Sequence, residues 1–136
     1  MTPRVTPRGR LLLVEPQFVM RRTVSTLARD MGLADVQEAT SPAVAERLLS
    51  ESRFSALLVA IDEAGEALQL LQRLRGGETR HPADVPVAVT AAACDVELAM
   101  RLKQLDIRRL LLKPFKVRGM LEVISALGAP EPLPGV

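Results

Sequence analysis

The sequence predicts an α/β domain built on a doubly wound parallel sheet of five strands with helices on both faces. Five short apolar runs recur along the chain, and a longer stretch with helical spacing of apolar residues follows each of them. A strand-then-helix order repeated five times returns the chain to the sheet in one direction, which makes the strands parallel. The 136 residues, of which 48% are hydrophobic, have room for one such core and no second one.

The predicted strands are runs rich in leucine, valine, isoleucine and alanine. Two of them, Ala56–Ile61 and Leu110–Leu112, are apolar throughout, which is typical of strands covered on both faces. The complete set is Leu11–Val14, Val36–Ala39, Ala56–Ile61, Val87–Thr90 and Leu110–Leu112.

The first two predicted helices have recognisable ends. Apolar residues three or four positions apart run from Phe18 to Met31, and Gly32 then offers a stop. Ser41-Pro42 has the pattern of a second helix start, in which a capping hydroxyl precedes a proline at the first helical position.

The other three predicted helices follow in the same way. Apolar residues repeat over 68–74 before Gly76-Gly77 ends the third helix. Asp95 is the expected cap of the fourth helix, and residues 117–127 give the fifth a continuous apolar stripe.

Charge and proline content separate two tails from a domain at residues 10–128. The chain has 18 basic and 16 acidic residues, and the excess lies near the start, in Arg4, Arg8 and Arg10. We interpret residues 1–9 as a disordered basic tail and residues 129–136, with their alternating prolines, as a proline-rich tail. A nucleic-acid partner is not expected, because such domains usually spread basic charge over a face of the fold.

The composition also excludes several other classes of protein. No apolar run approaches the roughly 18 residues that a membrane span needs, so we expect a cytoplasmic protein. A single cysteine, Cys94, and a single histidine, His81, exclude a disulfide framework and a transition-metal site. His81 stands beside Pro82 and is interpreted as a loop residue without a role.

Ligands of open doubly wound sheets bind beyond the carboxyl ends of the strands, which directs attention to the residues there. They include Glu15-Pro16, Ala60–Glu63, Thr90-Ala91 and Lys113-Pro114. No glycine-rich phosphate loop follows the first strand, so we expect no nucleotide cofactor. No base and nucleophile can be paired among these residues, so we expect no catalytic residues and no enzyme.

Several segments, in order, match a known pattern over about residues 10–128. They are Met20–Val24, Asp30–Leu33 with Val36–Ala39, Leu68–Arg75, Pro86–Ala91 and Leu112–Phe115. The sequence thereby resembles the receiver domain of bacterial response regulators, in particular the CheY-like chemotaxis type. The resemblance implies a flavodoxin-like fold with strand order 2-1-3-4-5 and five helices, and a role in two-component phosphorelay signal transduction.

In that family an aspartate at the end of the third strand accepts a phosphoryl group, and two acids after the first strand help to hold Mg²⁺. A threonine and a lysine contact the phosphate, and Thr90 and Lys113 match them. Glu15 matches the first acid, but Pro16 stands at the second and has no side-chain oxygen, so no metal site is expected. Glu15 and Lys113 could instead form an ion pair that holds an empty pocket together.

The phosphoacceptor position is the main departure from the family. An alignment with one deleted loop residue places Ala60 there, and an ungapped count places Val59; neither is a nucleophile. Asp62 could serve only if three loop residues were missing, and it is otherwise a loop residue or an acid at the start of the third helix. The expected degenerate phosphorylation pocket consists of Glu15, Pro16, Ala60, Asp62, Thr90 and Lys113.

Leu110 stands where the family has an aromatic switch residue. With Leu98, Leu102 and Val123 it could form an apolar patch on the face made by the fourth helix, fifth strand and fifth helix, the usual partner or dimer surface of the family. The alternative is that these four residues are core.

We therefore expect an atypical receiver, or pseudo-receiver, that acts by binding a signalling protein or a second copy without aspartyl phosphorylation and without a cofactor. Two alternatives stay open. One is a phosphorylatable receiver that uses Asp62, and the other is a domain that binds a small molecule or nucleotide in the crevice at the carboxyl ends of the strands.

Overall fold

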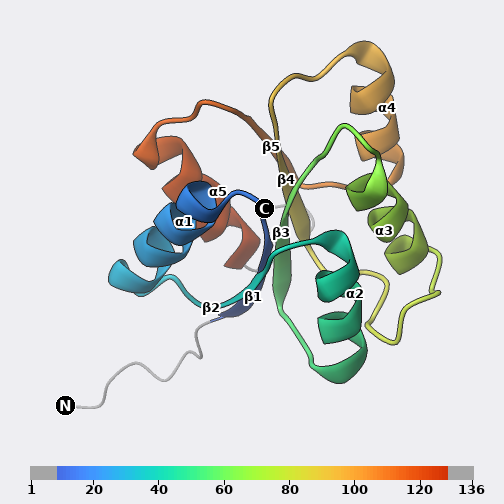
Figure 1. Cartoon of the computed structure of the whole chain (residues 1–136), viewed down its shortest axis with the longest axis horizontal. Coiled ribbons are helices and arrows are strands. Elements are labelled where there is room, and N and C mark those ends of the chain that lie inside the picture. The colour runs from blue at the N-terminus through green and yellow to red at the C-terminus, as the bar shows by residue number, and fades with distance from the viewer. Residues whose placement is uncertain (1–8, 129–136) are drawn as a thin grey trace, which may run out of the picture.

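The computed structural model describes residues 9–128, in which five strands alternate with five helices (Figure 1). The strands are β1 (Gly9–Val14), β2 (Ala34–Ala39), β3 (Ala56–Ala60), β4 (Val87–Ala91) and β5 (Arg109–Leu112). The helices are α1 (Phe18–Asp30), α2 (Pro42–Glu51), α3 (Glu66–Arg75), α4 (Val96–Gln104) and α5 (Val117–Gly128). All strand pairs are parallel and the order is β2-β1-β3-β4-β5, which confirms the predicted fold.

The boundaries of the elements differ little from those predicted. β1 begins at Gly9, one residue before the expected start of the domain, and the rest of the two predicted tails lies outside the described residues. The Ser41 hydroxyl accepts a hydrogen bond from the backbone N–H of Val44, and the Asp95 carboxylate caps α4 in the same way. Both predicted helix caps are therefore confirmed. None of the described helices is long and apolar enough to cross a membrane.

The helices cover the sheet in two layers, with α1 and α5 on one face and α2, α3 and α4 on the other (Figure 1). The chain winds from β1 to β2 on one side and then crosses to β3 on the other side of β1. Such a reversal opens a crevice between the carboxyl ends of the two strands that flank it. β1 and β3 are these strands, and Val14 pairs with Val59 close to their ends.

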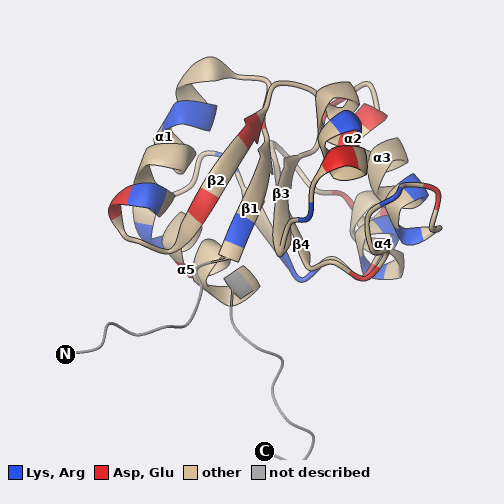
Figure 2. Cartoon of the chain, turned by 90° about the horizontal axis from the view of Figure 1, so that it is seen from below, with Lys and Arg blue, Asp and Glu red and all other residues tan. Residues whose placement is uncertain are grey.

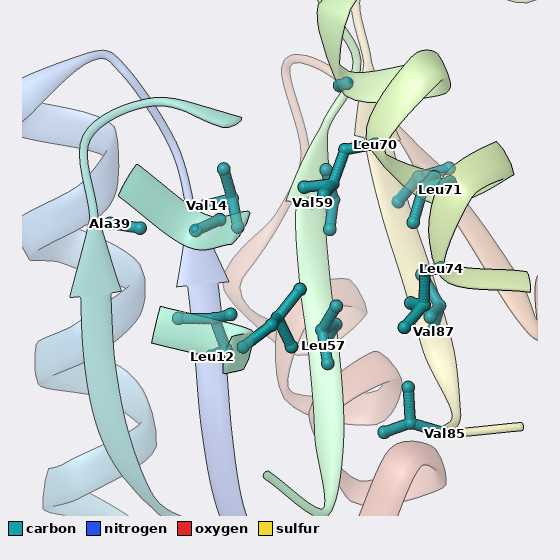
Figure 3. Close-up of a cluster of buried hydrophobic side chains, with 14 of the residues drawn as sticks. Leu12, Val14, Ala39, Leu57, Val59, Leu70, Leu71, Leu74, Val85 and Val87 are labelled. Atoms are coloured by element: carbon teal, nitrogen blue, oxygen red, sulfur yellow. The ribbon is translucent and has the colours of Figure 1, made fainter. Parts of the chain in front are cut away.

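Each face of the sheet carries its own apolar core. Alternate residues of a strand point to opposite faces, so Leu12 and Val14 face α2 and α3, whereas Leu11 and Leu13 face α1 and α5. Figure 3 shows Leu12 and its neighbours on β1 and β3 in the first of these cores. β3 and β4 are buried along their full length, which explains why their sequences are apolar apart from Thr90.

β5 does not have the burial that its sequence predicts. It is an edge strand with β4 as its one neighbour, and the side chains of Leu110 and Leu112 are 36% and 48% exposed. The side chains of Leu110 and Leu112 point to the face of the sheet on which α4 lies. Leu102 is the one fully buried side chain of α4, and this helix leaves β5 largely uncovered. The expectation that 110–112 is covered on both faces is therefore wrong.

The buried face of α1 also differs from the predicted one. Phe18 and Met31, the ends of the predicted apolar stripe, are both exposed. The buried residues are Arg21, Val24, Ser25 and Ala28, so two polar side chains lie on the face of the helix that meets the sheet.

Candidate functional site

The parallel sheet brings four of the predicted pocket residues to one edge. Ala60, the last residue of β3, pairs with Thr90 of β4. Glu15 directly follows β1, and Lys113 directly follows β5. Backbone hydrogen bonds continue the ladder past the strand ends, from Glu15 N to Ala39 O at 3.1 Å and from Lys113 N to Ala91 O at 2.8 Å. These side chains therefore start from well-fixed positions on the backbone.

Glu15 and Lys113 form the ion pair that the sequence suggested. The Lys113 ammonium donates to Oε1 of Glu15 at 2.7 Å, across 98 positions of sequence. The other carboxylate oxygen accepts the backbone N–H of Gln17 at 3.1 Å. Glu15 is only 3% exposed, so both of its oxygens are satisfied inside the protein. A buried carboxylate bonded in this way has little capacity left for a metal ion.

Arg21 holds the loop between β1 and α1, a role that the sequence analysis missed. Its guanidinium donates to the backbone oxygens of Glu15 at 3.0 Å and Pro16 at 3.3 Å, and it lies over the ring of Phe18. A signal was present in the spacing, because positions 21, 24, 25 and 28 share one helix face. An arginine on a buried face needs acceptors, and the loop carbonyls supply them.

Glu38 of β2 joins this network from the neighbouring strand. Its carboxylate accepts hydrogen bonds from Arg21 at 3.1 Å and Arg22 at 2.9 Å, and Arg29 lies 3.8 Å away. Burial raises the pKa of Glu38, but the nearby Ser25 side chain and the two nearer guanidiniums outweigh this effect, so the pKa lies below its ordinary value.

The structure separates the two candidate phosphoacceptor positions. Val59 is fully buried between Val14 and Val89 in the middle of the sheet. Ala60 lies at the carboxyl edge beside Thr90, so the position that faces the crevice carries a methyl group.

Asp62 lies beyond the strand end and bonds to α3. Its Oδ1 accepts the backbone N–H of Ala67 at 3.0 Å, and its carbonyl accepts the N–H of Gly65 at 3.3 Å. Gly65 adopts the left-handed conformation (φ +81°) that lets the loop turn sharply into the helix. This geometry matches the interpretation of Asp62 as an acid at the start of the third helix.

No cluster of three or more histidine, cysteine, aspartate or glutamate side chains with metal-binding geometry occurs within residues 9–128. Thr90 is buried at the edge, and the peptide bond between Lys113 and Pro114 is cis. The edge thus presents an alanine, a buried threonine and an internally paired Glu15 and Lys113.

Two of the four predicted partner-binding residues are core residues. Leu102 and Val123 are each 5% exposed and pack in the two apolar cores, because their positions on α4 and α5 face the sheet. Leu98 is partly buried against the same core as Leu102, and Leu110 alone of the four is exposed. The exposed large apolar side chains of α4, β5 and the start of α5 are Val96, Met100, Leu110, Leu112 and Val117.

No protein-family model matches this chain. It is 26% identical over 120 residues to chemotaxis protein CheY-3 of Vibrio cholerae, a match that covers 87% of this chain and 90% of that protein.

Solved structures of other proteins superpose on this chain over most of its length. A response regulator receiver protein from Pseudomonas putida superposes with a TM-score of 0.79 at 22% identity, over 90% of this chain and 99% of that one. Chemotaxis protein CheY4 of Vibrio cholerae gives 0.78 at 17% identity, over 89% of this chain and 99% of that one. At these identities the structural matches establish the fold.

Proposed function

We propose that this chain, which is a CheY-like response-regulator receiver domain, acts in two-component signalling as a pseudo-receiver that binds a protein partner without aspartyl phosphorylation. The observation that carries the proposal is the methyl group of Ala60 at the end of β3, beside Thr90. Without a carboxylate there, the edge lacks a nucleophile to take a phosphoryl group.

The residues present also do not fit the Mg²⁺ that the family implies. Mg²⁺ is usually held by one or two carboxylates together with phosphate oxygens. Both oxygens of Glu15 are already bonded, Pro16 has no side-chain oxygen, and Asp62 bonds to the backbone of α3. We therefore derive no metal-dependent step for this chain.

The pocket contains its own charge pair. The Lys113 ammonium, which the family uses to contact phosphate, is bonded to Glu15 at 2.7 Å. A ligand shifts a conformational equilibrium only by its differential affinity for the two states. If no phosphoryl group attaches, the domain remains in one conformation and its surface is presented constitutively.

The proposed partner surface lies on α4, β5 and the start of α5. It combines exposed apolar side chains, Leu110, Leu112 and Val117 among them, with Arg109 and Arg118. A groove of about 910 Å³ between β5 and α5 is lined by both arginines and by one acid, Glu122. This combination suits a signalling protein that presents apolar side chains flanked by acidic ones. A second copy of the chain is the alternative occupant.

Treatment with acetyl phosphate and Mg²⁺ tests the proposal. We expect the intact mass of the wild type to stay unchanged, because position 60 carries no nucleophile. The matched control is Ala60→Asp with Pro16→Asp, which restores both missing carboxylates and should gain one phosphoryl group. A phosphoryl adduct on Asp62 of the wild type would overturn the pseudo-receiver and favour the phosphorylatable alternative.

A further inference from the structure

His81 is the single histidine of the chain and lies in the segment between α3 and β4, far from the carboxyl edge. It is only 4% exposed. It is a loop residue, as predicted, but its ring is packed into the structure at the amino end of the sheet.

The ring of His81 connects two segments through both of its nitrogens. Nε2 accepts the backbone N–H of Phe54 at 2.9 Å, and Nδ1 lies 3.3 Å from the carbonyl oxygen of Pro82. A carbonyl can only accept, so these contacts require a neutral ring with its proton on Nδ1. The ring also stacks on Phe54, with centroids 6.1 Å apart and planes at 23°.

The charged groups around this ring are mixed in sign. On the β1 side, the Arg10 guanidinium lies 4.9 Å from the centroid of the Phe54 ring. Two hollows of about 500 and 230 Å³ have both His81 and Arg53 in their walls. The charged residues that line these hollows are Arg10, Arg53, Arg80, Asp84 and Glu51. Three of these five residues are arginines and two are acids.

We propose that His81 is a pH-sensitive latch that fastens the segment after α3 to the start of β3. Protonation of Nε2 replaces the acceptor of the Phe54 N–H with a second donor, so this hydrogen bond is lost. A buried backbone N–H without an acceptor destabilises the closed arrangement. The ring then leaves Phe54 and the segment around it opens to water.

Arg75 limits how far the opening spreads. Its guanidinium donates to the carbonyl oxygens of Ala83 and Val85 at 2.7 Å each, and so holds the part of the segment that leads into β4. Opening is therefore confined to the residues around Thr79–Pro82. It exposes the ring of Phe54, which is buried in the closed form, at the end of the sheet opposite the carboxyl edge.

Amide hydrogen exchange of the wild type between pH 7 and pH 5, followed by NMR, tests the latch. Protection of the Phe54 amide, corrected for intrinsic exchange, should fall by up to about tenfold for each pH unit below the protonation midpoint. Histidine is the side chain whose charge ordinarily changes in this range, and the chain has one. The Phe54 change should therefore share its midpoint with the imidazole C–H shifts of His81.

His81→Gln is the matched control, because its amide oxygen can accept from Phe54 N–H but does not titrate. Its Phe54 protection should stay constant over the same range. Constant protection in the wild type down to pH 5 would overturn the latch, and so would an equal loss in His81→Gln. If His81→Gln does not fold, the wild type alone still tests the latch, because separate midpoints for its imidazole and its Phe54 amide would overturn it.

Discussion

At the residue scale, the pair of Glu15 and Lys113 determines the character of the carboxyl edge. The carboxylate is buried and the ammonium is partly exposed. Glu15 therefore needs the opposite charge of Lys113 more than Lys113 needs that of Glu15. Removing one partner of a buried pair leaves the other charge without compensation, which costs more than the pair itself contributes.

Lys113→Met should therefore lower the free energy of unfolding by about 1–3 kcal/mol, less than for a fully buried pair because water reaches the ammonium. Adding Glu15→Gln should recover much of this loss, since the stranded charge is then gone. Urea unfolding of the two single variants and the double variant at pH 7 measures the coupling. Additive losses would show that the two side chains do not stabilise each other.

Leu110 and Leu57 lie on the same sheet, but Leu110 is a surface residue and Leu57 is a core residue. It is exposed by about a third, so Leu110→Ala should cost about 1 kcal/mol or less, whereas Leu57→Ala in the first core should cost about 2–5 kcal/mol. Thermal unfolding of both variants measures the difference. Under the proposed function, Leu110→Ala should also weaken partner binding. A strongly destabilised Leu110→Ala that still binds its partner would remove Leu110 from the interface.

At the element scale, one arginine joins the end of α3 to the segments before β4 and after α4. Arg75, at the end of α3, donates to Ala83 and Val85 before β4, and to Leu105 and Asp106 after α4. Burial lowers the pKa of its guanidinium, which nevertheless remains charged at neutral pH. All four acceptors are backbone oxygens, and they lie in two separate loops. Only the several N–H groups of a planar guanidinium can donate to all of them at once.

Arg75→Met should lower the free energy of unfolding by about 2 kcal/mol, because several carbonyls lose a charged donor together. Arg75→Lys should recover only part of this, since an ammonium cannot span both loops. Denaturant unfolding measures the series, with exposed Arg101→Met on α4 as the control. A loss for Arg75→Met no larger than that of the control would contradict this role.

The elements themselves could be predicted because the sequence signals them locally. Apolar runs placed the strands, and Ser41, Asp95 and the glycines marked helix ends. The pairing of Glu15 with Lys113 could be anticipated because parallel strands bring their ends together. The hydrogen-bond partners of Arg75 and His81 could not be predicted, since they include backbone atoms about 30 residues away along the chain. The burial of Leu102 and Val123 depends on how α4 and α5 pack, which spacing alone does not determine.

At the scale of the whole molecule, charge is distributed without a dominant face in the view of Figure 2. Basic residues predominate on α1 and acidic residues on the neighbouring β2, whereas both signs are mixed over the α2, α3 and α4 layer. The arginines around Glu38 are part of this pattern, and they tie α1 to the edge strand β2. The stability of the domain in acid therefore depends on this carboxylate.

A carboxyl group whose pKa is lower in the folded state stabilises that state above its unfolded pKa. The contribution is lost as the pH falls through the folded value. For Glu38 the unfolded reference is 4.5 and the folded pKa lies below it. The wild type should exceed Glu38→Gln in stability at neutral pH, and the difference should shrink below about pH 4.5. Urea midpoints from pH 7 to pH 3 measure this; a difference that does not vary with pH would contradict it.

The open edge of β5 has a further consequence for behaviour at high concentration. An edge strand presents unpaired backbone groups that another chain can adopt as a template for β-assembly. The run Leu110–Leu112 is apolar, and Arg108 and Arg109 stand directly before it. Positive charges at such a place act as gatekeepers, because two copies that align their edges bring like charges together. This protection comes from electrostatic repulsion between copies of the chain, so it weakens as added salt screens the arginines.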